Sequence, residues 1–301
     1  MKRYILLIVG AVVLLAPILV SGCAPAGSPE LGSPENPIII AFVPSGEMER
    51  VTAGGEAVAE LLAEETGYTI ESTVATSYAA AIEAMGAGEA QVGMLATFAY
   101  LLAHEKYDVE VGLVSVRYGS PYYTGQIIVG ADTGIETLAD VAGRSVCWVD
   151  ATSTSGYIIP RVVLGAAGVD PESDLGQEVE AGSHDLVVMS VYSGDCEVGA
   201  TYVDARDVVA GDFPDVFDKV LVIAESPEIP NDGVQFAPDV PDEVRESLIA
   251  GFLAMTETEE GLEALDIAYD WGDLVEKDDS FYDGFRQTLD AAGVVLDEYV
   301  D

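Results

Sequence analysis

The chain alternates short, continuously apolar runs with longer helical patterns, and this alternation restricts its fold more than any other feature. The runs PIIIAFV (37–43), QVGMLA (91–96) and SVCWVD (145–150) have the composition of strands that are buried on both faces of a sheet. Helical patterns lie between them, and the pattern over residues 51–67 stops at Gly67. The sequence therefore predicts an α/β fold with mainly parallel sheets flanked by helices.

Two segments indicate where the chain passes from one lobe to another. YYTGQIIVG (122–130) is a long β-like run, and SPEIPNDGVQFAP (226–238) is rich in Pro, Asn, Asp and Gly. Further strands are expected at 69–75, 110–117, 197–203 and 219–224. We expect lobe 1 to comprise residues 37–124 and 235–301, and lobe 2 to comprise 125–234. Because ligands of open α/β sheets bind beyond the carboxyl ends of strands, two facing lobes would form a cleft.

The N-terminus has the features of an export signal. Lys2 and Arg3 precede an apolar run over residues 4–20, and VSGC follows. A retained membrane-spanning anchor is one interpretation, because the run approaches spanning length. VSGC resembles the lipobox of bacterial lipoproteins, which implies that residues 1–22 are a signal peptide and that Cys23 carries lipid. Residues 23–36 are then expected to form a flexible linker between membrane and folded body.

Acidic residues strongly outnumber basic ones. The chain has 53 Asp and Glu against 12 Lys and Arg, and a formal net charge of -41. Such a charge repels phosphate backbones and anionic lipid, so nucleic acid is excluded as a partner. The surface resembles those of proteins from saline habitats, although an acidic exported protein is the simpler alternative.

Cysteine usage and the absence of cofactor motifs limit the chemistry further. Cys147 and Cys196 lie in or beside expected strands, and the sequence leaves open whether they form a disulfide or stay as two buried thiols. No Cys/His spacing typical of a metal site and no Walker or dinucleotide glycine pattern occurs in the sequence. We therefore expect neither metal nor cofactor.

The stretch DATSTSGYIIP (150–160) is the clearest candidate for an anion site. It joins an expected strand to a helix, and Pro160 requires that helix to begin close to Ser155. Hydroxyl groups of Ser153 and Thr154 would then meet free backbone N–H groups at a helix N-terminus, which favours an anion despite the acidic surface. An ordinary N-cap is the alternative interpretation.

A second junction of this kind places His184 at the start of another helix pattern, in EAGSHDLVVMSVYSG (180–194). A histidine there can donate to an anion, although the helix dipole disfavours its protonation. A purely structural histidine is the alternative.

These elements together resemble a known family. The runs ATSYAAAIEAMGAGEAQVGMLATFAYLLAHEK, DATSTSGYIIPRVVL, GSHDLVVMSVYSGDCEVGATY and SPEIPNDGVQF are similar to the PhnD-like substrate-binding proteins of phosphate, phosphite and phosphonate ABC transporters. The resemblance implies the type 2 periplasmic binding protein fold, and the chain would work as an extracytoplasmic monomer with a permease and a separate ATPase. The ligand-binding residues that it implies are Tyr78, Tyr100, Ser153, Thr154, Ser155, His184 and Asp232, with Asp204 as a weaker candidate.

The chain departs from the family pattern before the second tyrosine, where Ala96, Thr97 and Phe98 replace a Gly-Pro-like turn. Core packing is the alternative role for Tyr78 and Tyr100. For Asp232 the alternative is a surface turn. A carboxylate beside the ligand is useful if the ligand carries a proton or an amine, because an ionised carboxylate only accepts hydrogen bonds.

Two rival functions remain open at this point. Ser155, His184 and Asp232 are the residue types of a hydrolytic triad, but the chain has no G-x-S-x-G nucleophile elbow. A binding protein of the same fold for a sulfonate, a thiamine precursor or an amino acid is the other alternative.

Overall fold

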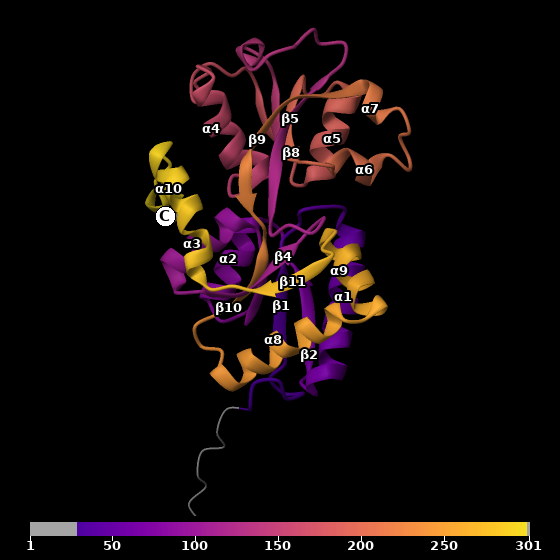
Figure 1. Ribbon diagram of the computed structural model, residues 1–301, viewed down its shortest axis with the longest axis vertical. Coiled ribbons are helices and arrows are strands. Elements are labelled where there is room, and N and C mark those ends of the chain that lie inside the picture. The colour runs from indigo at the N-terminus through magenta and orange to yellow at the C-terminus, as the bar shows by residue number, and fades with distance from the viewer. Residues whose placement is uncertain (1–28, 300–301) are drawn as a thin grey trace, which may run out of the picture.

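The computed structural model describes residues 29–299, which form two lobes, each built on one β-sheet (Figure 1). The first lobe has a six-stranded sheet of order β11-β4-β10-β3-β1-β2, and the second has a five-stranded sheet of order β7-β6-β8-β5-β9. The strands of the first sheet are β1 (Ile38–Phe42), β2 (Ile70–Val74), β3 (Val92–Leu95), β4 (Glu110–Val116), β10 (Gly233–Phe236) and β11 (Asp273–Glu276). The strands of the second sheet are β5 (Tyr122–Gly130), β6 (Val146–Trp148), β7 (Glu178–Glu180), β8 (Val198–Tyr202) and β9 (Val220–Pro230).

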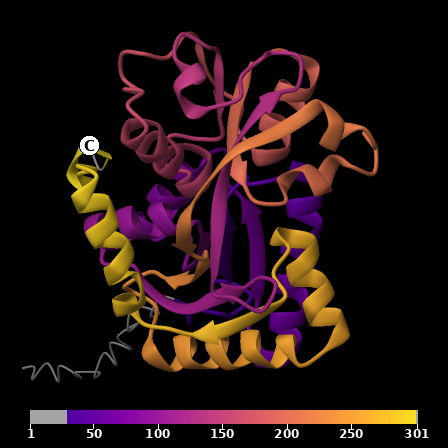
Figure 2. The same cartoon turned by 45° about the horizontal axis from the view of Figure 1, so that its top comes forward.

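Two long strands connect the lobes. β5 carries the chain into the second lobe and β9 brings it back, and the two pair antiparallel from Tyr122 opposite Pro230 to Gly130 opposite Val220 (Figures 1 and 2). The lobe limits expected after residues 124 and 234 fall inside β5 and β10. The chain changes sheet between β4 and β5, and again between β9 and β10.

The sheets are mixed, so the prediction that they are mainly parallel is wrong. β1 runs parallel to β2 and β3, and β6 runs parallel to β7 and β8. The other neighbouring pairs are antiparallel. Every antiparallel pair includes a crossover strand, β5 or β9, or a strand that forms after the chain has returned to the first lobe, β10 or β11. The α/β class and the two-lobed architecture are as expected.

Helices cover both faces of the sheets. In the first lobe α1 packs with α8 and α9 on one side, while α2 and α3 pack on the other (Figure 2). The helices associated with the first lobe are α1 (Met48–Thr66), α2 (Tyr78–Gly86), α3 (Thr97–Tyr107), α8 (Asp242–Thr256), α9 (Glu259–Tyr269) and α10 (Asp283–Ala291), with single turns at Asp279–Tyr282 and Leu296–Tyr299. Those of the second lobe are α4 (Ile159–Ala166), α5 (His184–Ser193), α6 (Ala205–Val209) and α7 (Val216–Lys219), with turns at Leu138–Val141 and Thr154–Ile158.

The first long helix ends where the sequence predicts. Gly67 follows α1 in the left-handed conformation, with φ 76°, and its N–H donates to the carbonyl of Ala63. Glycine adopts this conformation without steric cost, so the helix stops and the chain turns into β2.

The folded body begins earlier than expected. The N–H of Gly32 donates to the carbonyl of Asn36 at 2.8 Å, and the N–H of Thr69 donates to the carbonyl of Gly32 at 2.7 Å. The last part of the expected linker is therefore attached to the start of β2. The expected signal peptide and Cys23 lie outside the described residues. Within residues 29–299 no helix has the length and apolar character needed to cross a membrane.

Cys147 and Cys196 form a disulfide, with their Cα atoms 5.8 Å apart. Cys147 lies in β6, and Cys196 lies just before β8, its parallel neighbour. The bond therefore joins two adjacent strands of the second sheet whose side chains are buried.

Candidate ligand-binding site

A cavity of about 40 Å³ lies between the lobes, and both lobes and both crossovers contribute to it. Its polar lining residues are Ser45, Glu47, Arg50, Tyr78, Arg117, Tyr123, Ser153, Thr154, Ser155, His184, Asp185, Tyr202, Asp232, Tyr269 and Asp270. Six of the eight residues singled out in the sequence as ligand-binding candidates are in this set. Tyr100 and Asp204 are not.

The turn formed by Ser153, Thr154 and Ser155, called the hydroxyl turn below, is fixed by hydrogen bonds and close packing. Ser153 caps the first turn, because its Oγ accepts a hydrogen bond from the N–H of Gly156 at 3.2 Å. The helical conformation begins at Thr154, one residue from the predicted start, as a π-helical turn that leads into α4. A Cβ atom at Gly156 would lie 2.4 Å from Val149 Cγ2, so only glycine allows the turn to pack this closely on the strand.

The turn is also joined to the first lobe. The N–H of Phe98, in α3, donates to Thr154 Oγ1 at 2.8 Å, and the N–H of Tyr78, at the start of α2, donates to Asp150 Oδ2 at 3.2 Å. In the opposite direction the N–H of His184 donates to the carbonyl of Ser45 at 3.1 Å. The structure therefore shows the lobes in direct contact around the cavity.

His184 is buried and neutral. It is the first residue of α5, as the sequence predicts, and its Nδ1 lies 2.8 Å from Thr201 Oγ1. Its ring meets that of Tyr202 edge to face at 4.6 Å. Burial, together with the nearby charge of Arg117, lowers the pKa of His184 to about 3. A neutral imidazole faces the cavity and can act through its other ring nitrogen.

Asp232 lies in the turn between β9 and β10, and its Oδ1 accepts a hydrogen bond from the N–H of Thr97 at 3.3 Å. Burial raises the pKa of Asp232 to about 6, although Arg117 and the Thr97 N–H both act to lower it. The carboxyl group can therefore gain or lose a proton close to neutral pH.

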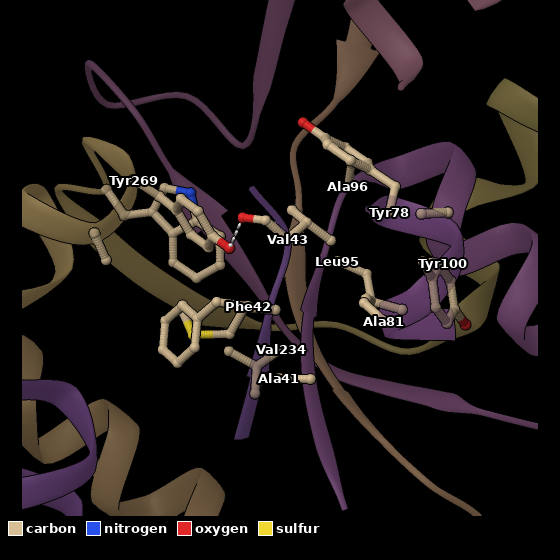
Figure 3. Close-up of a cluster of buried hydrophobic side chains, with 14 of the residues drawn as sticks. Ala41, Phe42, Val43, Tyr78, Ala81, Leu95, Ala96, Tyr100, Val234 and Tyr269 are labelled. Atoms are coloured by element: carbon tan, nitrogen blue, oxygen red, sulfur yellow. Dashed lines mark hydrogen bonds between the residues drawn. The ribbon is translucent and has the colours of Figure 1, made fainter. Parts of the chain in front are cut away.

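Four tyrosines line the cavity, and only Tyr78 was expected from the sequence. Tyr123, Tyr202 and Tyr269 are the others. Burial raises the pKa of all four above the usual tyrosine value, so their hydroxyl groups stay protonated and can donate hydrogen bonds. Tyr269 already donates to the carbonyl of Val43 at 2.8 Å (Figure 3).

Tyr100 faces away from the cavity, so the expectation that it contacts the ligand is wrong. Figure 3 shows the Tyr78 and Tyr100 hydroxyls pointing in different directions from the same core. Tyr100 donates to Asp279 Oδ1 at 2.6 Å, and its ring packs on Tyr282 at 4.9 Å. In the segment that departs from the family pattern, Ala96 lines the cavity and the next two residues donate backbone N–H groups towards it.

Asp204 lies outside the cavity lining, in an adjoining groove that it forms with Arg117, Asp207 and Asp270. Burial, together with the charge of Asp207, raises the pKa of Asp204. The structure therefore places Asp204 in a neighbouring groove and not in the cavity wall.

Five charged residues of the cavity wall were not expected from the sequence, namely Glu47, Arg50, Arg117, Asp185 and Asp270. Arg50 donates to Asp270 Oδ1 at 2.5 Å and to the carbonyl of Asp266 at 2.8 Å. Arg117 has a longer ion pair with Asp270 Oδ2, at 3.7 Å, and its guanidinium lies over the Tyr202 ring at 4.7 Å. Arg50, Arg117 and Asp270 stand singly in the sequence with no motif around them, and the fold alone brings them together.

The arrangement gives no support to a hydrolytic triad. Within residues 29–299 no hydrogen bond joins Ser155 to His184 or His184 to Asp232, and the histidine nitrogen that such a triad would use for orientation faces Thr201. The same part of the chain holds no cluster of three or more side chains suited to a metal ion.

The profile of the periplasmic substrate-binding proteins of phosphonate ABC transporters matches residues 40–282. The chain belongs to this family. The phosphate-import protein PhnD of Mycolicibacterium smegmatis is 29% identical over 303 aligned residues, which cover 92% of this chain and 93% of that protein.

Solved structures agree on the fold. PhnD1 from Prochlorococcus marinus, in complex with methylphosphonate, aligns with a TM-score of 0.77 and 13% identity over 86% of this chain and 98% of that one. A binding protein component of an ABC phosphonate transporter from Pseudomonas aeruginosa aligns with a TM-score of 0.75 and 21% identity over 87% and 95% of the two chains. As a member of this family the chain is an extracytoplasmic substrate-binding component of an ABC transporter.

Proposed function

We propose that the cavity captures one small phosphorus oxyanion, namely phosphate, phosphite or methylphosphonate, and that the closed protein delivers it to an ABC permease driven by a separate ATPase. The observation that supports this most is the cavity itself. It combines a very small volume with hydroxyl, phenol and imidazole groups from both lobes.

Size restricts the ligand first. The cavity volume is about 40 Å³, whereas an engineered cavity of roughly 150 Å³ holds a benzene molecule. A tetrahedral oxyanion with at most a methyl substituent suits this closed state, and a nucleotide or a long-chain phosphonate does not. We infer that the protein transports the smallest members of the ligand class.

Hydrogen-bonding groups restrict the ligand next. Ser153, Thr154 and Ser155 provide hydroxyls at a helix N-terminus, a local arrangement that favours an oxyanion. Asp232 in its ionised form accepts a hydrogen bond from a protonated oxygen of the ligand. Sulfate and sulfonates have no such proton at neutral pH, so they would place two negative groups face to face.

The contacts between the lobes support a closing mechanism. In an open state the N–H groups of Tyr78 and Phe98, together with the hydroxyl turn, would face solvent, and rotation about β5 and β9 would bring them together around the ligand. Small-angle scattering tests this. Compaction on saturation with a ligand is expected, and an unchanged radius of gyration with a bound ligand contradicts the closing mechanism.

We further propose that the mature protein is a monomer attached to the outer face of the membrane through lipid on Cys23. Incorporation of a labelled fatty acid by cells that express the whole chain, with loss in Cys23→Ser, tests the anchor. Label retained in Cys23→Ser contradicts it.

Calorimetric titration of the mature chain tests the binding function. We expect tight binding of at least one of phosphate, phosphite and methylphosphonate, and no response to sulfate or taurine. Ser155→Ala should weaken binding, whereas Ser193→Ala, an exposed serine at the end of α5, should not. Binding of taurine in place of the phosphorus compounds would favour another solute. Turnover of a chromogenic phosphonate ester that is lost in Ser155→Ala would favour an enzyme.

A further inference from the structure

Arg117 is a mostly buried arginine in the cavity wall whose donors are largely unused. Its side chain is 11% exposed, and its Nε atom is buried without a hydrogen-bond partner among residues 29–299. Its nearest carboxylate oxygen, Asp270 Oδ2, is 3.7 Å away, which is too long for a hydrogen bond. A buried guanidinium with unused donors is costly unless another group binds it.

Arg117 shares its ion-pair partner with a second arginine. Asp270 forms its short contact with Arg50, so the carboxylate nearest to Arg117 is already engaged by another guanidinium group. Arg50 directs its hydrogen bonds to Asp270 and to the Asp266 carbonyl. Arg117 is thus the member of the pair that remains able to bind an anion.

The charge of Arg117 acts on titratable groups from both lobes. It lowers the pKa of six surrounding side chains. They are Tyr118, Tyr123, His184, Tyr202, Asp204 and Asp232. Asp270 pairs with it directly.

We infer that Arg117 contacts the bound oxyanion and selects for its charge, so that the site binds a doubly charged oxyanion more tightly than a singly charged one. This inference rests on the proposed binding of a phosphorus oxyanion. A guanidinium stacked on an aromatic ring presents its edge in a fixed orientation, and a planar fork of N–H donors suits two oxygens of a tetrahedral anion. For phosphate, whose dianion keeps one proton, Asp232 then selects for that proton while Arg117 selects for the charge.

Inorganic phosphate is the probe. At pH 6 it is mainly a monoanion and at pH 8 mainly a dianion, and both forms keep a proton for Asp232. Because Asp232 itself titrates near pH 6, the comparison of variant and wild type at each pH is what isolates the effect of Arg117. The wild-type protein should bind phosphate more tightly at pH 8. Arg117→Gln should lose about 10- to 100-fold in affinity at pH 8, since a hydrogen bond to a charged group is removed, and less at pH 6.

Two further variants separate a role in binding from a role in folding. Arg117→Lys keeps the charge but not the fork, so it should retain the preference for pH 8 with a weaker affinity. Arg206→Gln is the matched control, because Arg206 also has a buried Nε without a hydrogen-bond partner in the described chain and lies over an aromatic ring, Phe217, at 5.1 Å, outside the cavity. It should bind like the wild type.

The outcomes are distinct. Affinity of Arg117→Gln within about twofold of the wild type at both pH values overturns the inference. An equal loss at both pH values, shared by Arg117→Lys, also overturns it, because that pattern indicates a structural role. Failure of the wild-type protein to bind phosphate, phosphite or methylphosphonate contradicts the proposed function itself.

Asp270→Asn covers the case in which Arg117→Gln does not fold. Asp270 has a positive φ of 55°, a conformation that asparagine tolerates, so the change removes charge with little strain. Freed from their shared carboxylate, the two arginines should bind phosphate more tightly at pH 8. Unchanged or weaker binding overturns the inference.

Discussion

Thr154 Oγ1 in the second lobe accepts a hydrogen bond from the backbone N–H of Phe98 in the first lobe, at 2.8 Å. Both groups are buried. The N–H belongs to the first turn of α3, where it has no partner within the helix, so the contact between the lobes is what satisfies it. The Thr154 hydroxyl uses only a lone pair in this contact, and its own proton is free to be donated. Under the proposed mechanism, this one side chain links closure of the lobes to ligand binding.

Thr154→Val should therefore impair both closure of the lobes and ligand binding. Loss of the hydroxyl leaves the Phe98 N–H unsatisfied in the closed state, which costs about 1–3 kcal/mol, and removes one ligand donor. We expect at least a roughly 10-fold loss of ligand affinity by calorimetry. Thr154→Ser should retain most of the affinity, and Thr288→Val, on the exposed face of α10, should be neutral. Wild-type affinity in Thr154→Val would disprove the link.

Asp232→Asn should relax the selection between phosphate and sulfate. In the wild type, Asp232 is ionised above pH 6 and repels an anion without a proton, whereas below pH 6 it is protonated and can donate. Discrimination against sulfate should therefore weaken as the pH falls below 6 in the wild type, and it should be weak at every pH in the variant. Paired titrations with both anions at pH 5 and 8 measure this. Asp212→Asn, at an exposed position, is the control.

The same carboxyl group should affect stability. Because its folded pKa is raised from 3.8 to about 6, its favourable contribution is present at low pH and is lost as the pH rises through 6. Asp232→Asn should consequently be more stable than the wild type at pH 8, by up to about 3 kcal/mol, and should have no such advantage at pH 4. Denaturant unfolding at the two pH values measures this difference in the free energy of unfolding between variant and wild type. A difference of the same size at pH 4 and pH 8 contradicts the raised pKa.

His184 should make the protein sensitive to acid. Its pKa is lowered from 6.5 to about 3, so its contribution to stability is present above pH 6.5 and is lost as the pH falls towards 3. Between pH 7 and 4.5 the wild type should lose about 3 kcal/mol more than His184→Gln. His104→Gln, which leaves His184 in place, should keep the wild-type acid response. Equal acid sensitivity in His184→Gln would show that another group is responsible.

Local signals accounted for much of the site. The turn at Ser153–Ser155 follows from a strand, a run of hydroxyl residues and a proline just beyond, and each of these acts over a few residues. His184 was placed at a helix start by the same kind of pattern. These predictions depend on hydrogen bonds between near neighbours in the chain, and the structure places both segments as expected.

Long-range packing accounted for the rest, and there the sequence could not suffice. Arg117 enters the cavity because β4 ends beside the second lobe, and nothing near position 117 indicates this. Tyr100 was assigned as a ligand contact from the family resemblance, close to the segment where the chain departs from the family pattern. Its hydroxyl instead donates a hydrogen bond to Asp279, which lies 179 residues later in the chain. The strands β10 and β11 have four residues each and were not predicted separately. Their antiparallel direction depends on how the crossovers return the chain.

The disulfide should stabilise the protein without taking part in binding. It closes a segment between residues 49 positions apart, for which the chain-entropy argument gives about 4 kcal/mol of stabilisation. Neither cysteine lines the cavity. We therefore expect the double variant Cys147→Ala and Cys196→Ala to unfold at lower denaturant concentration and to keep its ligand affinity where it is folded. A reducing agent should shift the wild type towards the variant and leave the variant unchanged. Loss of affinity without loss of stability would show that the bond positions the hydroxyl turn, which lies shortly after β6 in the chain.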